Sequence, residues 1–180
     1  MNRFQLEHVI RAAAGNANVR DIVVIGSQAI LGKHPEAPAE LLQSMEADVF
    51  PLDAPERSIV IDGAMGELSL FHETFGYYAH GVDESTAVLP LDWKARLVRI
   101  ENENTMGARG WCLEAHDLAV SKLAASREKD LEYVRALVRL GLVEPAIVRL
   151  RLAETPALTP SARALANSRL ESWSSRSGGG

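Results

Sequence analysis

The sequence predicts an α/β (α+β) fold, in which a mixed sheet with flanking helices is followed by a helical C-terminal bundle. Three features of the 180 residues carry this prediction: a β-branched run at 21–25 that ends in glycine, an alternating segment at 45–50, and apolar residues at helical spacing from residue 115 onward. With 47% apolar and 24% charged residues, a chain of this length builds a core without disulfides or structural metal.

The first elements are a helix, a buried strand and a tight turn. Apolar residues at helical spacing indicate an amphipathic helix that stops near Gly15 and Asn16. The run 21–25 suits a strand that is buried on both faces and therefore covered on each side. It ends at the Gly26-Ser27 turn, after which a short helix is expected to stop near Gly32.

The next strand carries two acids on one face. Pro38 is expected to open a short helix through Leu42, and residues 45–50 then alternate with the period of a strand. Alternation places Glu46 and Asp48 on one face of that strand. Two carboxylates therefore point the same way.

Residues 56–113 predict shorter elements. Glycines interrupt the pattern, so we expect short helices around Ile59 and Phe71. Further expected elements are a strand at 77–82, a helix at 90–97 and strands at 97–101 and 111–113.

The C-terminal part predicts helices only. Their expected ranges are 115–126, 128–140, 145–152 and 160–170, with Gly141 ending the second and Thr159 capping the last. We therefore divide the chain into an α/β core at 1–113, a helical subdomain at 114–171 and a disordered tail at 172–180.

Charge and cysteine content exclude some classes of protein. The net charge of −5 disfavours a plain nucleic-acid-binding module, although residues 1–90 carry net −8 and residues 91–180 carry net +3. The single Cys112 permits no intramolecular disulfide and is expected to be a small buried hydrophobe. Since there is no signal-like or membrane-spanning segment, we expect a cytoplasmic protein with no membrane partner.

Glu46 and Asp48 are candidate metal ligands. Their positions lie about 7 Å apart along a strand, so both carboxylates can reach one hard cation. Mg²⁺ prefers one or two carboxylates together with phosphate oxygens, which suits a nucleotide site. The alternative is a solvated strand face.

The Gly26-Ser27 turn is a candidate phosphate site. Glycine lets the backbone approach a ligand closely, and N–H groups at the start of the following helix would face a phosphate. The alternative is a turn that only connects two elements.

Together these residues resemble a known signature. Gly26-Ser27 at a strand-to-helix turn, with Glu46-Ala47-Asp48 on the next strand, is similar to the motif of the nucleotidyltransferase fold. The similarity is to the minimal nucleotidyltransferases and the abortive-infection (AbiEii-like) type IV toxins, and in particular to an uncharacterised bacterial family of that fold. The stretch 118–131 resembles the lysine, arginine and aspartate helix motif of those toxin-like proteins.

The resemblance implies an enzyme that moves a nucleoside monophosphate from a nucleoside triphosphate to a hydroxyl of RNA or protein, with Mg²⁺ or Mn²⁺ as cofactor. For a toxin it also implies a cognate antitoxin as partner. In such enzymes Gly26 and Ser27 would contact phosphate, and Glu46 and Asp48 would hold the metal.

The resemblance further implies roles in the helical part. Lys122 would bind the nucleotide and offset charge on its phosphates, and Asp130 would orient the acceptor or Lys122. With Asp48 these are the expected catalytic residues, and we expect the acidic core and the basic helices to meet at the active site. The alternative for Lys122 and Asp130 is a solvated helix face with weak ion pairs.

The sequence also departs from the family pattern. The first acid is Glu46 rather than Asp, and 18 residues separate it from the turn. No third carboxylate is identified among the candidates Glu101, Glu103 and Asp83. A catalytically degenerate nucleotide- or protein-binding module is therefore the alternative function.

Aromatic and histidine residues remain outside this scheme. Core packing and a base-stacking platform are both open for Phe71, Phe75, Tyr77 and Tyr78. His72 and His80 are not predicted as metal ligands, because no Cys or His lies at zinc-like spacing from them.

Overall fold

The structure, a computed structural model, describes residues 1–177 and divides into two compact units. Unit 1 comprises residues 1–86 and 96–114, and unit 2 comprises residues 87–95 and the chain from 115 onward. The segment 87–95 thus belongs with the helices rather than with the α/β part, since the Leu91 N–H donates a 2.9 Å hydrogen bond to the carbonyl of Glu154.

Unit 1 is built on a five-stranded mixed sheet with the order β3-β2-β1-β5-β4. The strands are β1 (Asp21–Ile25), β2 (Glu46–Pro51), β3 (Tyr78–Gly81), β4 (Val98–Ile100) and β5 (Arg109–Cys112). Pairs β1–β2 and β4–β5 are antiparallel, whereas β1–β5 and β2–β3 are parallel. The mixed sheet expected from the sequence is confirmed.

Helices cover one face of this sheet. They are α1 (Arg3–Ala17), α2 (Ser58–Met65) and α3 (Leu70–Phe75). Helix α1 packs against β1, β2, β3 and β5, and it approaches Gly110 of β5 so closely that a Cβ there would lie 2.4 Å from Ile10 Cδ1. Gly110 shares its face of the sheet with the buried Ala47 and Val49 of β2, since β1 joins their strands in register. Glu46 and Asp48 therefore lie on the opposite face, as alternation along β2 predicts.

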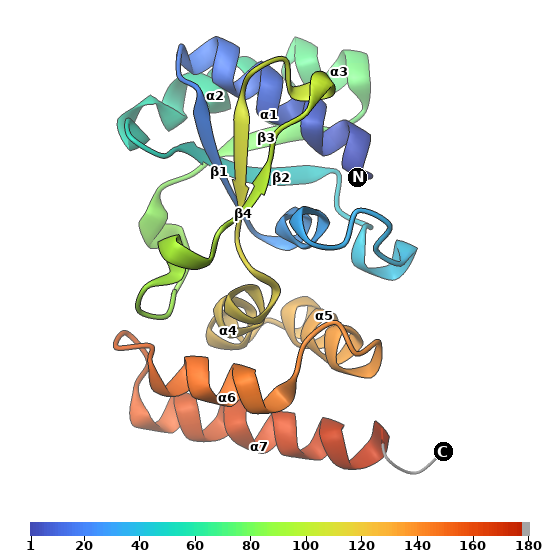
Figure 1. Cartoon of the computed structure of the whole chain (residues 1–180), viewed down its shortest axis with the longest axis vertical. Helices are drawn as coiled ribbons and strands as arrows, with labels where there is room; N and C mark the ends of the chain where they lie inside the picture. The colour runs from blue at the N-terminus through green and yellow to red at the C-terminus, as the bar shows by residue number, and fades with distance from the viewer. Residues whose placement is uncertain (178–180) are drawn as a thin grey trace. The chain divides into compact units, whose positions relative to one another are not determined.

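Unit 2 is a bundle of four helices. They are α4 (Ala115–Ala125), α5 (Glu128–Arg139), α6 (Pro145–Ala153) and α7 (Pro160–Ser177). Helix α7 packs against α4, α5 and α6, and α6 and α7 run next to each other in Figure 1. The predicted caps are confirmed: Gly141 has φ +66° after α5, and Thr159 Oγ1 accepts a 3.2 Å hydrogen bond from the Ala162 N–H.

The predicted helix ends need correction at two places. Helix α1 does not stop at Gly15 but continues to Ala17, which is buried, and ends at Asn18 with φ +50°. Residues 172–177 are helical rather than a disordered tail, because α7 continues past the buried Leu170, whose carbonyl accepts a hydrogen bond from Ser174 Oγ. Residues 178–180 of the expected tail lie outside the described residues.

Several short segments are 3-10 helices, and the sequence indicated ordinary helices at the first, second and fifth of them. They are η1 (Ser27–Gly32), η2 (Ala39–Leu41), η3 (Pro55–Arg57), η4 (Glu84–Thr86), η5 (Trp93–Arg96) and η6 (Glu103–Thr105). A tighter helix satisfies its backbone within a single short turn, which suits the Pro- and Gly-rich connections here.

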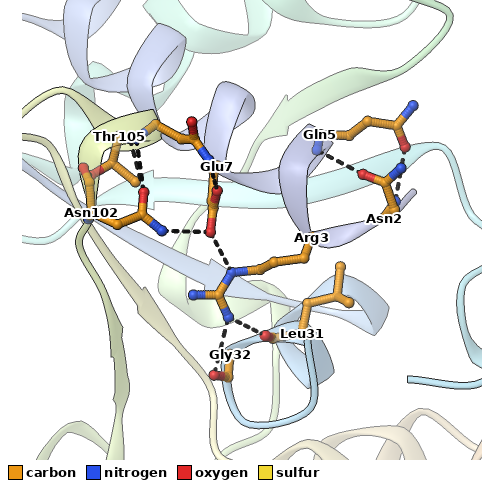
Figure 2. Close-up of polar contacts among 9 residues, drawn as sticks. Asn2, Arg3, Gln5, Glu7, Leu31, Gly32, Asn102 and Thr105 are labelled. Atoms are coloured by element: carbon orange, nitrogen blue, oxygen red, sulfur yellow. Dashed lines mark hydrogen bonds and ion pairs between the residues drawn. The ribbon is translucent and has the colours of Figure 1, made fainter. Parts of the chain in front are cut away.

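A polar network fixes the end of η1 (Figure 2). Arg3 of α1 donates hydrogen bonds to the carbonyls of Leu31 at 2.5 Å and Gly32 at 3.3 Å. The buried Glu7 accepts a 2.7 Å hydrogen bond from Arg3 Nε and one of 2.8 Å from Asn102 Nδ2. The segment that begins at the Gly26-Ser27 turn is thus tied to α1 at its far end.

Within the described residues, no helix has the length and apolar character needed to cross a membrane. Cys112 is fully buried, and burial raises the pKa of its thiol to about 12. Its predicted role as a small buried hydrophobe is confirmed.

Candidate metal and nucleotide site

The Gly26-Ser27 turn lies directly against Asp48. Antiparallel pairing of β1 with β2 sets Ile25 opposite Asp48, so the chain turns at Gly26 beside that carboxylate. Gly26 has φ +73° and ψ −168°, a region that only glycine adopts readily. A Cβ at this position would lie 2.2 Å from Asp48 Oδ2. Glycine is therefore required both for the backbone conformation and for the space next to Asp48.

Glu46 and Asp48 point to the same open face of β2. Their side chains are 36% and 31% exposed, whereas Ala47 and Val49 between and beyond them are buried. Ser44 Oγ accepts a 3.1 Å hydrogen bond from the Glu46 N–H and fixes the entry into the strand. The carboxylates are thus held by a buried strand and still reach solvent.

His80 lies next to the two acids, a proximity that the sequence did not predict. Parallel pairing of β3 with β2 places His80 opposite Asp48. His80 Nδ1 lies 3.1 Å from Glu46 Oε1 and 3.5 Å from Asp48 Oδ1. One ligand atom from each of the three side chains lies within 4.8 Å of the others. Spacing along the sequence could not reveal this group, because strand pairing brings together Glu46 and His80, which are 34 positions apart.

Tyr78 and Asp62 border this group. The Tyr78 hydroxyl donates a 3.3 Å hydrogen bond to Glu46 Oε2, and burial, followed by the charge of Glu46, raises the pKa of Tyr78 to about 12. On the other side of the imidazole, Asp62 Oδ1 of α2 lies 4.0 Å from His80 Nε2 and accepts a 3.3 Å hydrogen bond from the Gly81 N–H.

Of the aromatic residues, three pack together away from the acids. The rings of Phe71, Phe75 and Tyr77 contact one another and His8 of α1, with ring centroids between 4.6 and 6.0 Å apart. Burial lowers the pKa of His8, in keeping with an apolar cluster. Tyr78 instead contacts His72, with 4.7 Å between the ring centroids and the rings tilted by 46°. Tyr77 is 6% exposed and packs in the core, whereas Phe75 is 45% exposed and lies at the rim of this aromatic cluster.

Lys122 and Asp130 form an ion pair inside unit 2. Lys122 Nζ lies 3.0 Å from Asp130 Oδ1 and 4.5 Å from the centroid of the Tyr133 ring, and Arg127 Nε lies 2.6 Å from Asp130 Oδ2. Burial tends to raise the pKa of Asp130, but hydrogen bonds from Arg127 and Lys122 and their charges outweigh it and hold the pKa below its usual range. These residues do not form the solvated helix face that was the alternative, since Asp130 is 1% and Lys122 9% exposed.

None of the three candidates for a third carboxylate joins the group within the described residues. Glu101 lies 3.2 Å from Arg20 and also pairs with Arg99, beyond β4 at the far side of the sheet from β3. The Asp83 carboxylate accepts a 2.8 Å hydrogen bond from the Ser85 N–H. Within residues 1–177, the third member of the group is His80 and not an acid.

The donor set fits a divalent cation. Carboxylate oxygens suit Mg²⁺ and Mn²⁺, and one ligand atom from each of Glu46, Asp48 and His80 lies within 4.8 Å of the others. The two acids are about one-third exposed, so phosphate oxygens and water could reach an ion held by them. The turn at Gly26 adds backbone beside the same carboxylate, so the residues present fit a metal that also binds an anionic ligand.

Comparison with known proteins identifies the family. Residues 3–172 match the model of a family described as nucleotidyltransferase of unknown function (DUF6036). No curated protein and no solved structure matches the chain. Because the family model extends over nearly the whole chain, this protein belongs to that nucleotidyltransferase family.

Proposed function

We propose that the protein is a divalent-metal-dependent nucleotidyltransferase that moves a nucleoside monophosphate from a nucleoside triphosphate to a hydroxyl of RNA or protein. The observation that carries the proposal is the convergence of Glu46, Asp48 and the Gly26 backbone on the open face of β2, where β1 ends. Family membership supports the reaction class, and the site supplies the residues.

In this proposal the chain positions the reactants and neutralises charge. A bound Mg²⁺ or Mn²⁺ supplies Lewis-acid stabilisation of the phosphoryl oxygens. Glu46 and Asp48 hold the ion, while Gly26 and Ser27 lie against the phosphates. The acceptor oxygen then bonds to the α-phosphorus as pyrophosphate leaves, and water at the half-exposed site takes the hydroxyl proton.

Lys122 and Asp130 retain the roles that the family resemblance implies. Asp130 would orient the Lys122 ammonium, in keeping with their 3.0 Å contact, and Lys122 would offset phosphate charge. If so, Lys122→Met lowers the rate of transfer in a protein that remains folded, whereas Lys129→Met on the exposed side of α5 leaves the rate unchanged.

The decisive experiment is transfer of label from α-³²P nucleoside triphosphates to cellular RNA and protein. We expect labelling with Mn²⁺ or Mg²⁺ that disappears with a chelator and in Asp48→Asn. Asp53→Asn makes the same chemical change at an exposed position beyond β2 and should retain labelling. Labelling that survives Asp48→Asn would refute the assignment.

A nucleotide-binding module without transfer is the second candidate, favoured by the absence of a third carboxylate from the group within the described residues. It predicts metal-dependent nucleotide binding with no transferred label. A toxin role with a cognate antitoxin is a separate extension of the first proposal: expression would arrest growth, and Asp48→Asn would abolish the arrest.

A further inference from the structure

We propose that His80 is the third metal ligand, bonding through Nδ1, and that it gives the site a preference for Mn²⁺ over Mg²⁺. This inference rests on the proposed metal-dependent function and deepens it. It assigns to a histidine the place for which the sequence offered only carboxylates.

The backbone fixes His80 at this position. It lies on β3, which pairs in parallel with β2 so that His80 stands opposite Asp48 and shares its face. Gly81, the next residue, approaches α2 so closely that a Cβ would lie 2.0 Å from the Ser58 carbonyl oxygen. The strand that carries His80 is therefore clamped between β2 and α2.

The ring is oriented as a metal ligand would be. Nδ1 faces the two carboxylates at 3.1 and 3.5 Å, and Nε2 faces Asp62 at 4.0 Å. Histidines that bind metal through one nitrogen commonly donate the other N–H to a carboxylate, which fixes the tautomer and makes the ligating nitrogen more basic. A small rotation of the half-exposed Asp62 side chain brings its oxygen within hydrogen-bond distance of Nε2.

The ligand atoms of Glu46, Asp48 and His80 determine which divalent ion the site prefers. The set contains two carboxylates, which offer oxygen, and one imidazole, which offers nitrogen. Mg²⁺ is a hard ion that prefers oxygen and binds imidazole nitrogen poorly. Mn²⁺ accepts the same oxygens and tolerates imidazole better. A third ligand that is histidine rather than acid therefore shifts the balance toward Mn²⁺.

The test uses Mn²⁺ bound to the full chain, followed by electron paramagnetic resonance. Pulsed measurements detect the ¹⁴N nucleus of a directly coordinated imidazole, which does not depend on activity. We expect nitrogen modulation in the wild type and in His72→Gln, a matched control for a histidine outside the group. His80→Gln should lose the modulation and bind Mn²⁺ at least about tenfold more weakly, with a smaller change for Mg²⁺.

A reciprocal variant keeps the test falsifiable. His80→Asp restores three carboxylates and should shift the preference from Mn²⁺ toward Mg²⁺. Mn²⁺ binding that needs Asp48 but shows no nitrogen modulation would overturn the role of His80 and leave the proposed function intact. Mn²⁺ binding that neither His80→Gln nor Asp48→Asn weakens would overturn both.

Discussion

Replacing Gly26 by alanine should damage the site more than the fold. The backbone at φ +73° and ψ −168° disfavours a side chain by about 1–3 kcal/mol. The new Cβ would also lie 2.2 Å from Asp48 Oδ2, whereas real Cβ contacts essentially never fall below 3.0 Å. Because Oδ2 is the far end of a short side chain, the carboxylate rather than the backbone moves, by about 0.8 Å or more.

The expected result follows from these two terms. A domain with ordinary stability of about 5–15 kcal/mol stays folded after such a loss. Displacement of a metal-binding oxygen by nearly 1 Å, in contrast, costs about 100-fold in rate. Urea unfolding measures the loss of stability. Mn²⁺ affinity and the rate of label transfer measure the damage to the metal site.

Gly76→Ala provides the matched control. Gly76 has φ +72°, but no atom lies within 4 Å of a Cβ placed there. It should lose about 1–2 kcal/mol of stability and keep the metal affinity of the wild type. If Gly26→Ala also kept full metal affinity, the close approach of this turn to Asp48 would have no functional meaning.

Three further perturbations test the rest of the structure. Asp130→Asn leaves the buried Lys122 without its carboxylate and should cost about 3–5 kcal/mol at pH 7. Since the pKa of Asp130 is lowered in the folded protein, its contribution is complete above about pH 4 and is lost only as the pH falls through the lowered pKa. The difference in urea unfolding between variant and wild type should therefore shrink as the pH is lowered below about 4, and a difference that stays constant would contradict the ion pair. Glu7→Ala removes the hydrogen-bond acceptor for Arg3 and two asparagines and should lower the free energy of unfolding by about 2–4 kcal/mol. The control Glu73→Ala, on the surface of α3, should leave the stability nearly unchanged. Equal urea unfolding midpoints for the two variants would refute the importance of the network in Figure 2. Burial raises the pKa of all three tyrosines. Their absorbance at 295 nm should therefore change little by pH 10 in the folded protein and substantially in urea. Ionisation of the tyrosines at pH 10 without urea would show that they are not buried in the folded protein.

Local sequence patterns predicted the part of the site formed by the Gly26-Ser27 turn, Glu46 and Asp48. The β-branched run before Gly26 and the alternation around Glu46 and Asp48 depend on neighbouring residues, and the structure places those residues in β1, the turn and β2 as expected. The proximity of the turn to Asp48 then follows from the antiparallel pairing of two strands that are close in the sequence.

The place of His80 in the site could not be predicted, because it depends on the pairing of strands that are far apart in the sequence. His80 reaches Asp48 only because β3 adds to the edge of the sheet in parallel with β2, and no local pattern specifies that partner or register. The same limit applies to Asp130, whose burial depends on packing among α4, α5 and α7 rather than on its neighbours in sequence. Neighbouring residues alone therefore left a solvated helix face open as the alternative for Asp130, which is 1% exposed.

The most direct test of the central claim is anomalous diffraction from crystals soaked with Mn²⁺ and a non-hydrolysable nucleoside triphosphate. We expect a Mn²⁺ peak at bonding distance from the carboxylates of Glu46 and Asp48, with the triphosphate against the backbone of Gly26 and Ser27. A metal and nucleotide bound elsewhere, or a nucleotide bound without metal at these acids, would contradict it.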